Sequence, residues 1–341
     1  MSSIDRRTFI ASAAGTAALT ALEAAPASSA QGPVFIGTWE WGKPASERAA
    51  EVLHGGGSLL DAIEKGINRI EDDPNVMTVG YGRLPNAEGE VELDAGIMDG
   101  TRHRAGAVFN LHKIKNPISV ARFVLEKTRH TQPAGQGALR FAIEMGFEPL
   151  QLLTTKSLET WLKWKNTPNH QTYWIDKNNH DTVGMAGAYN GKVAAGCCTS
   201  GLAWKIPGRV ADSPIVGCGY YADDTAGAAS ATGNGDVMSN YCTSSYIVQK
   251  MREGMNPQAA CEDAMRFMAG STPSGATAPQ HCKRRSRFTD EVRIQALKLR
   301  RFFLGAPRLN EQKDDERHNP HAENNKRVLA YRIDDFVRMR S

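Results

Sequence analysis

The chain has 341 residues, of which 41% are hydrophobic and 7% aromatic, so it is long enough to bury a large core in one domain or two. Its formal net charge of +4 is small and uneven, because residues 283–341 hold 16 Lys and Arg against 9 Asp and Glu, while the rest of the chain is slightly acidic. The basic balance belongs to the C-terminal tail, and no nucleic-acid partner is expected for the body of the protein.

The first thirty residues have the pattern of an export signal. Arg6-Arg7 precedes an Ala-rich apolar stretch without Lys or Arg, and small residues stand before Gln31. Phe9, two residues after the arginine pair, resembles the twin-arginine pattern. We predict a twin-arginine-type signal peptide over residues 1–30 and a periplasmic or secreted protein; the alternative is a frayed amphipathic segment. The apolar stretch is too short for a stable membrane span.

Helix and strand signals alternate from residue 44 to residue 145. Ser58 with Asp61 forms a capping box for a helix that Asp72-Asp73-Pro74 closes. In chain order, the hydrophobic pattern predicts a helix over 44–53, the capped helix up to residue 72, strands over 77–81 and 90–98, and helices over 117–127 and 137–145.

A polar stretch over about 154–179, expected to be a surface linker, leads to the run His180-Asp181-Thr182-Val183-Gly184. Two runs of small and β-branched residues then flank Asn190-Gly191, a dipeptide typical of type I′ turns, so a strand is expected to begin at Thr182. A threonine uncovered as a new N-terminus carries a nucleophile, its Oγ, and a base, its α-amine with a reference pKa near ~8. The alternative is an ordinary buried strand threonine.

Downstream, Arg209 and Asp212 lie three residues apart in GRVADSP. A free aspartate-type substrate presents an α-carboxylate and an α-ammonium, which require one binding group of each charge, and a guanidinium fork suits the carboxylate. The two residues are therefore a candidate substrate site, with a surface salt bridge as the alternative. A helix is expected over 257–268.

Other chemistries lack their motifs. The sequence contains no GxSxG elbow, phosphate-binding loop or HExxH. Its six cysteines show neither CxxC nor zinc spacing, and they are expected to be buried free thiols. His318 and His321 lie in a polar tail, where solvated histidines are the expectation. No cofactor and no metal is expected.

Several motifs together carry a resemblance to a known family. In register from about Trp39 to about Met268, the chain resembles the glycosylasparaginases, N-terminal-nucleophile hydrolases of the asparaginase type 2 family, in LHGGGSLLDAIEKGINRIEDDP, TVGYGRLPN, IKNPISVARFVLEKT, HDTVGM, TSGLAWKIPGRVADSPIVGCG and ATGNGD. The resemblance implies an α+β fold, a four-layer αββα sandwich. It also implies autocatalytic cleavage into an α-chain part, 31–181, and a β-chain part, 182–270, which assemble as a homodimer of cleaved units.

The resemblance further implies roles for named residues. The implied catalytic residues are the nucleophile Thr182, its hydrogen-bonding partner Thr199, and an oxyanion hole of Thr232 and Gly233; Arg209, Asp212 and Trp39 would bind substrate, and His180 and Asp181 would serve autocleavage. The implied reaction splits the amide of N-acetylglucosaminyl-asparagine. Two alternatives are an L-asparaginase or isoaspartyl peptidase of the same fold, and an inactive, non-cleaving homologue.

Two departures from the family pattern stand out. Arg83 replaces the second glycine of the usual VGYGG, and it is expected to lie close to the autocleavage region. After about Gly270, the alternating strand pair that ends this fold is not recognisable, so the C-terminal strands are expected to be missing or replaced by a divergent, basic, flexible tail over 271–341. Within this tail, residues 289–303 are predicted to be helical.

Overall fold

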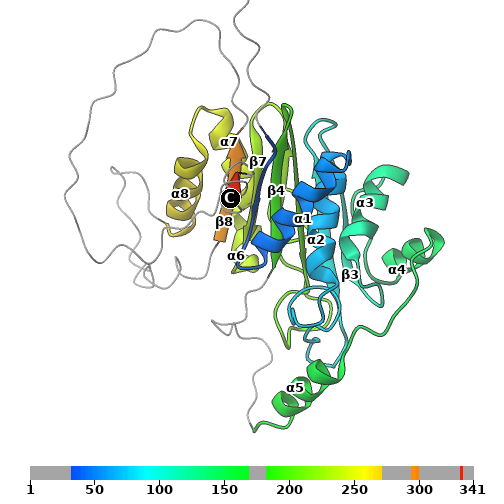
Figure 1. Ribbon diagram of the computed structural model, residues 1–341. Helices are drawn as coiled ribbons and strands as arrows, with labels where there is room; N and C mark the ends of the chain where they lie inside the picture. Colours follow the sequence, from blue (N-terminus) through cyan, green and yellow to red (C-terminus); the bar gives the residue numbers. More distant parts are fainter. Residues whose placement is uncertain (1–31, 169–181, 271–292, 299–330, 333–341) are drawn as a thin grey trace, which may run out of the picture. The chain divides into compact units, whose positions relative to one another are not determined.

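The computed structural model describes residues 32–168, 182–270, 293–298 and 331–332 (Figure 1). The expected signal peptide over 1–30, both autocleavage residues His180 and Asp181, and most of the tail lie outside these residues. Within the described part, no helix has the length and apolar character needed to cross a membrane.

The described residues form groups of strands and groups of helices that follow one another along the chain. The strands are β1 (Val34–Gly37), β2 (Leu93–Asp99), β3 (Arg104–Leu111), β4 (Val183–Tyr189), β5 (Lys192–Thr199), β6 (Tyr220–Asp223), β7 (Gly227–Thr232), β8 (Arg293–Lys298) and β9 (Tyr331–Arg332). The helices are α1 (Gly42–His54), α2 (Leu59–Glu71), α3 (Pro117–Lys127), α4 (Gly135–Glu144), α5 (Thr155–Lys165), α6 (Gly235–Tyr241), α7 (Thr243–Arg252) and α8 (Pro257–Met268).

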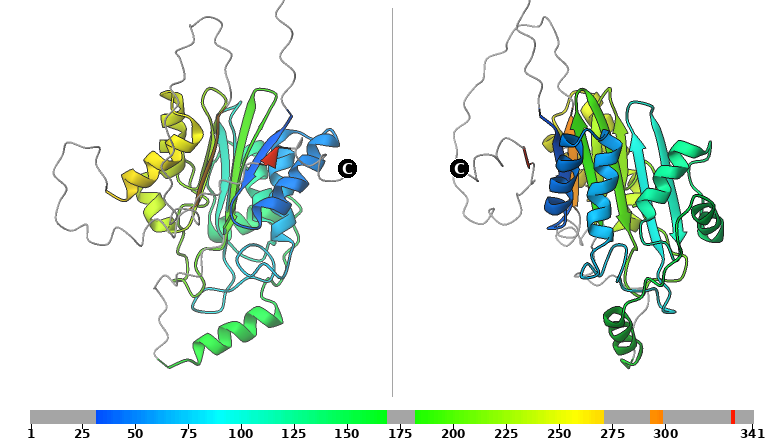
Figure 2. Two further views of the ribbon diagram at one scale, coloured as in Figure 1. Left: turned by 60° about the vertical axis from the view of Figure 1, so that its left-hand side comes forward. Right: turned by 45° about the vertical axis from the view of Figure 1, so that its right-hand side comes forward.

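Two sheets and two helix layers confirm the predicted αββα arrangement. The larger sheet has the order β3-β2-β5-β4-β1-β9 and the smaller one the order β6-β7-β8, with antiparallel pairing throughout. Figures 1 and 2 show α1, α2 and α3 against the larger sheet, and α7 and α8 against the smaller one. Strands from before and after Thr182 interleave in the larger sheet, so a cut there leaves the sheet's pairing intact.

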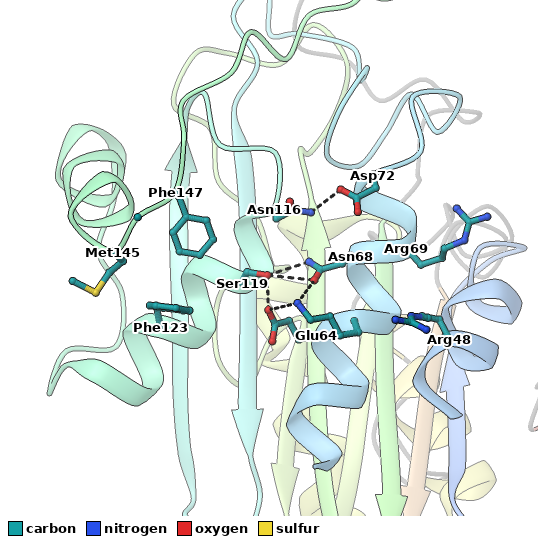
Figure 3. Close-up of a pocket in the computed structure, with 12 residues that line it drawn as sticks. Arg48, Glu64, Asn68, Arg69, Asp72, Asn116, Ser119, Phe123, Met145 and Phe147 are labelled. Atoms are coloured by element: carbon teal, nitrogen blue, oxygen red, sulfur yellow. Dashed lines mark hydrogen bonds and ion pairs between the residues drawn. The ribbon is translucent and has the colours of Figure 1, made fainter. Parts of the chain in front are cut away.

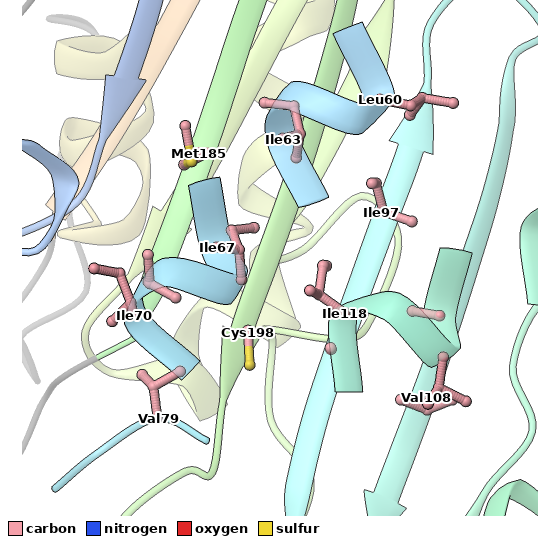
Figure 4. Packing of buried hydrophobic residues seen from close by; sticks show 14 of the residues in the cluster. Leu60, Ile63, Ile67, Ile70, Val79, Ile97, Val108, Ile118, Met185 and Cys198 are labelled. Atoms are coloured by element: carbon pink, nitrogen blue, oxygen red, sulfur yellow. The ribbon is translucent and has the colours of Figure 1, made fainter. Parts of the chain in front are cut away.

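Buried apolar side chains fill both spaces beside the larger sheet. Between this sheet and its helices, Ile63 and Ile67 of α2 pack towards Met185 and Cys198 (Figure 4). Between the two sheets the residues are mostly small, and Tyr220 is the large side chain there. A side chain at position 96 would overlap the Tyr220 ring, so Gly96 permits the sheets to approach.

Two local sequence signals, a helix cap and a hairpin turn, are confirmed. The capping box of Ser58 and Asp61 is present at the start of α2. The β4–β5 hairpin turns at Asn190 and Gly191, with φ of 48° and 75°, the left-handed values that a type I′ turn requires.

The prediction of a strand over 77–81 is wrong. These residues form turns, and Gly80 and Gly82 have φ of 66° and 84°, which no regular strand adopts. The backbone N–H of Tyr81 donates to the carbonyl of Glu71 at 2.8 Å, so this segment folds back on the end of α2.

The polar stretch expected to be a linker contains a helix, α5. Thr154 and Ser157 form a capping box at its start, and Trp164 stacks on Trp204 with ring centroids 4.9 Å apart. The start of this helix could have been predicted from its capping box. Its aromatic contact joins residues far apart in the sequence, so it could not be predicted without the fold.

The expected helix over 289–303 is wrong where the structure describes it, because residues 293–298 form β8. This strand pairs with β7 over its whole length, from Gly227–Lys298 to Thr232–Arg293. The pairing satisfies the backbone groups of an edge that would otherwise stay open. A second short tail strand, β9, pairs with β1. The closing strands were expected to be missing or replaced, and the described part of the tail contributes one strand to each sheet.

Candidate active site

Thr182 stands immediately before β4 and is 9% exposed. Its Oγ1 donates a hydrogen bond to Oγ1 of Thr199, at the end of β5, at 2.9 Å. The hydroxyl of Thr199 also accepts from the backbone N–H of Gly201 at 3.0 Å. The antiparallel hairpin thus brings together two threonines that the sequence analysis paired, and each hydroxyl is held in place.

Thr38, which the sequence analysis did not identify, completes this arrangement. Its Oγ1 donates to the carbonyl oxygen of Thr182 at 2.6 Å and accepts from the N–H of Gly184 at 2.9 Å. The side chain is fully buried at the end of β1, which pairs with β4. One hydroxyl therefore fixes the backbone on both sides of Val183. Its position beside Trp39 in GTWEWG was the only available signal.

Trp39 and Thr232 meet although they are far apart in the sequence. The indole Nε1 of Trp39 donates to Oγ1 of Thr232, at the end of β7, at 3.4 Å. Trp39 adopts a left-handed backbone with φ of 57°, which is unusual for a bulky residue. Gly233, with φ of 126°, lines a pocket together with Thr182 and Thr199. The predicted nucleophile and one member of the predicted oxyanion hole therefore share one pocket.

Asp212 lines the same pocket and is 3% exposed, so it is not a surface residue. Its Oδ2 has no hydrogen-bond partner among the described residues. Burial raises the pKa of Asp212 to about 7; the positive charge of Arg209 opposes this shift and the carboxylate of Asp236 adds to it. A buried carboxyl with an unused oxygen is poised to accept from a cationic ligand.

Arg209 also lines the pocket, but its ion partner differs from the predicted one. Its Nη2 lies 2.7 Å from Oδ2 of Asp236, in the first turn of α6, rather than bonding to Asp212. The Arg209 side chain is 17% exposed and that of Asp236 is 56% exposed. Asp236 could not be identified from the sequence, because it stands 27 residues from Arg209 and only the position of α6 brings the two together.

The pocket contains little free space. The space between Thr182, Asp212 and Gly233 measures about 20 Å³, roughly the room that one water needs. Gly235 permits this close packing, because a side chain there would overlap the carboxylate of Asp212. An aspartyl group is larger than this space, so side chains must move for it to enter. Arg209, which lines the pocket, bonds the exposed carboxylate of Asp236 outside it.

A buried charge cluster supports the loop that carries Arg209. Nζ of Lys205 lies 3.3 Å from Oε2 of Glu92 and 3.6 Å from Oδ2 of Asp94, with all three side chains 3% exposed or less. Oε1 of Glu92 also accepts from the N–H of Gly208 at 2.9 Å. Glu92 thus holds the loop immediately before Arg209.

Arg83, the departure from the family pattern, belongs to this buried region. Its Nε donates to the carbonyl of Leu84 at 2.6 Å and its Nη1 to that of Thr78 at 3.3 Å. Burial lowers its pKa to about 9, while Asp94 and Glu92 oppose the shift. The extra cation is therefore balanced by acidic neighbours. The carbonyl of Thr78 also accepts from the hydroxyl of Ser200, next to Thr199. Arg83 and Ser200 therefore share this carbonyl, close to the end of β5.

A second, larger cavity of about 580 Å³ lies beside α2 and α3 (Figure 3). Its polar groups bond one another: Ser119 donates to Glu64 at 2.6 Å, and Asn68 donates to Ser119 at 3.2 Å. None of the predicted catalytic or binding residues lines it. This cavity is a polar space beside the two helices. Among the described residues, no cluster of His, Cys, Asp and Glu is arranged to hold a metal.

The sequence is also similar to known proteins. A family model described as Asparaginase matches residues 42–278. The chain is 44% identical over 234 residues to an N(4)-(beta-N-acetylglucosaminyl)-L-asparaginase of Elizabethkingia miricola, covering 68% of each protein. It is 44% identical over 260 residues to a protein of the same name from Rattus norvegicus and 43% identical over 261 residues to one from Mus musculus, in each case covering 67% of this chain and 75% of the relative.

Proposed function

This chain belongs to the asparaginase family of amidohydrolases, and from that membership we propose that it hydrolyses the side-chain amide of N-acetylglucosaminyl-asparagine with Thr182 as an N-terminal nucleophile. The observation that carries the proposal is the shared pocket of Thr182, Thr199, Asp212 and Gly233. The names of the similar proteins support glycosylated asparagine as the substrate.

Substrate binding uses the two charged residues of the loop. The buried carboxyl of Asp212, with its unused oxygen, receives the α-ammonium of the aspartyl group, and this cation restores the ionised form that burial disfavours. Arg209 receives the α-carboxylate, which takes the place of Asp236 or shares the guanidinium with it. Both interactions recognise the free aspartyl end of the substrate, and neither recognises the sugar.

The reaction then follows two acyl-transfer steps. Oγ1 of Thr182 attacks the amide carbonyl carbon, and its proton passes through the α-amine to the leaving nitrogen, so the carbon–nitrogen bond breaks and a β-aspartyl ester remains. Thr232 Oγ1 and the Gly233 N–H stabilise the oxyanion, and Trp39 orients the Thr232 hydroxyl. Water attacks the ester, releases aspartate and restores the threonine.

The α-amine is available only after the Asp181–Thr182 bond is cut, so the proposal includes self-cleavage. The threonine hydroxyl attacks the preceding carbonyl and gives an ester that water hydrolyses. The hydrogen bonds that support this step are those from Thr38 and to Thr199, which fix Thr182 on both its carbonyl and its hydroxyl. This preorganisation serves both reactions.

Kinetics on matched substrates test the function. We expect hydrolysis of free N-acetylglucosaminyl-asparagine, and a loss of about ten- to a hundred-fold in kcat/KM when either α-group is blocked, since each charge-assisted interaction contributes ~1.5–3 kcal/mol. Asparagine as a second substrate tests the alternative specificity. Thr182→Ala should be inactive, and Thr160→Ala, on the exposed face of α5, serves as the matched control. Equal rates on blocked and unblocked substrates would contradict the substrate assignment.

A further inference from the structure

Two cysteines outside the catalytic centre lie against each other. Sγ of Cys218, just before β6, approaches the carbonyl oxygen of Ser239 at 3.7 Å, and Sγ of Cys242 approaches the same oxygen at 3.9 Å. The thiol of Cys242 is also a hydrogen-bonding neighbour of the Cys218 thiol. We propose that Cys218 and Cys242 are a thiol pair that a soluble disulfide oxidises to an intramolecular disulfide bond.

The backbone holds both cysteines in place. The N–H and the hydroxyl of Ser244 donate to the carbonyl of Cys218 at 3.2 and 2.7 Å, and the N–H of Ser245 donates to that of Gly217 at 2.8 Å. The segment before β6 therefore lies along the start of α7, directly after Cys242. These hydrogen bonds hold the two segments that carry the thiols side by side, and a disulfide requires such a close approach of the two backbones.

Cys242 has an unusual conformation for its residue type. It forms the junction between α6 and α7 with φ of 45° and ψ of 49°, a left-handed backbone that glycine or asparagine adopts more readily. Such strain persists where the surrounding structure imposes it, and it clusters at functional positions. In this conformation the Cys242 thiol lies beside the Cys218 thiol.

The other described cysteines do not form such a pair. Cys197 and Cys198 are neighbours on β5, and their side chains enter different cores, one between the sheets and one under the helices. Cys261 lies on α8, partly buried against the smaller sheet's core. Of the described cysteines, Cys242 is the one that is exposed.

This difference in exposure sets the order of the chemistry. Burial raises the pKa of Cys218 to about 12, so the exposed Cys242 reacts first. Cys242 loses its proton and its thiolate attacks one sulfur of the disulfide reagent, forming a mixed disulfide as one thiolate leaves. Cys218 then loses its proton and attacks Sγ of Cys242, and the second thiol leaves. The two cysteines give up two electrons and two protons, and one reagent disulfide becomes two thiols.

The bond would brace two walls of the active-site pocket. The segment from Cys218 leads to Gly219, whose N–H donates to the carbonyl of Asp212 at 3.0 Å. Cys242 ends α6, whose first turn carries Asp236, the partner of Arg209. A disulfide would therefore tie the end of α6 to the loop that holds Asp212, at a site that takes no part in the proposed reaction.

Mass spectrometry of the whole protein treated with oxidised glutathione tests the proposal. After denaturation and alkylation without reductant, trypsin leaves both cysteines on one peptide, residues 210–250, because no Lys or Arg lies between. We expect this peptide to lose two hydrogens and take no alkyl group at either position. Cleavage of this peptide before its aspartates should then release residues 212–222 and 236–250 as one linked species that separates on reduction.

Variants and thermal unfolding separate the possible outcomes. Oxidation should raise Tm by roughly 5–10 °C, since the bond closes a loop within residues 218–242. Reductant should reverse the rise. Cys218→Ser should retain glutathione on Cys242, Cys242→Ser should lose the effect, and Cys261→Ser, the matched control, should keep it. Stable glutathione on wild-type Cys242, with Cys218 still free after denaturation, would overturn the proposal. These readouts do not require enzymatic activity, so they are independent of the proposed function.

Discussion

The two sides of the pocket are built in opposite ways. On the hairpin side, Thr182, Thr199 and Thr38 bond one another and the backbone. On the opposite side, Asp212 has an unused buried oxygen, and Arg209 bonds an exposed carboxylate. Under the proposed function, this contrast means that the nucleophile is fixed before substrate arrives, whereas the binding groups acquire their final partners only with the ligand.

Apart from loss of the nucleophile itself, the largest effect is expected at Thr232, next to Gly233 of the pocket wall. Thr232→Val keeps the shape but removes the hydroxyl that Trp39 contacts and that the oxyanion requires. Loss of one such donor should lower kcat by about 10²–10³-fold with little change in KM. Steady-state kinetics on N-acetylglucosaminyl-asparagine measure this. A variant that raises KM alone would place Thr232 in ground-state binding instead.

On the binding side, Asp212→Asn should lower kcat/KM by about ten- to a hundred-fold, because the α-ammonium loses its charged partner. In the wild type, KM should fall as pH rises through about 7, where the free carboxyl ionises. The asparagine variant should lack this limb. A wild-type KM that is flat between pH 6 and pH 8 would contradict the role of Asp212.

Asp212→Asn should weaken substrate binding but increase stability near neutral pH. A carboxyl whose pKa is raised on folding contributes stability below its unfolded pKa, near ~3.9, and that contribution is lost as pH rises through about 7. Relative to the wild type, Asp212→Asn should therefore gain in free energy of unfolding as pH rises from about 4 to 7. Urea unfolding at both values measures this gain. A gain that shrinks with pH would show that the buried carboxyl is stabilised by its surroundings.

On the hairpin side, Thr38→Val should instead reduce stability. It leaves the carbonyl of Thr182 and the N–H of Gly184 without their buried partner, at a cost of about 1–3 kcal/mol for an unsatisfied group. Urea unfolding gives the value, and Thr160→Ala on exposed α5 is the control. If the two variants unfold at the same urea concentration, the hairpin side is not held as described.

The smallest effect is expected at Asp236. Its ion pair with Arg209 is exposed on the acidic side, and such pairs contribute about 0–1 kcal/mol. Asp236→Asn should change KM by no more than about fivefold, downwards, because the substrate carboxylate no longer competes for the guanidinium. Measuring KM and kcat separately distinguishes this competition for Arg209 from a structural effect of the substitution. A fall in kcat with constant KM would mean that Asp236 orients α6 rather than competing for Arg209.

Local sequence signals predicted the local parts of this fold well. The capping box at Ser58 and the turn at Asn190-Gly191 depend on neighbours within a few residues, and both are present. The expected strand over 77–81 failed because two left-handed glycines bend the chain there. The expected helix within the tail failed because pairing of β8 with β7, about sixty residues away, overrides local preference.

The candidate site shows the same difference between local features, which the sequence predicts, and long-range contacts, which it does not. Motifs identified Thr182, Thr199, Arg209 and Asp212, and the structure places all four on one pocket. Thr38 was missed because its hydroxyl reaches Thr182 across 144 residues of sequence. β8 also reaches this area, since the side chain of Gln295 donates to the carbonyl of Gly37, next to Thr38. Contacts of this kind carry no local pattern, so only the assembled sheets reveal them.

Intact mass and N-terminal sequence of the purified wild-type chain test the central claim, that Thr182 becomes an N-terminal nucleophile. With residues 1–30 removed, the account predicts fragments of 151 and 160 residues, the second beginning TVGMA, and an uncut chain for Thr182→Ala. A wild-type chain that stays intact on prolonged incubation, as Thr182→Ala does, would contradict it.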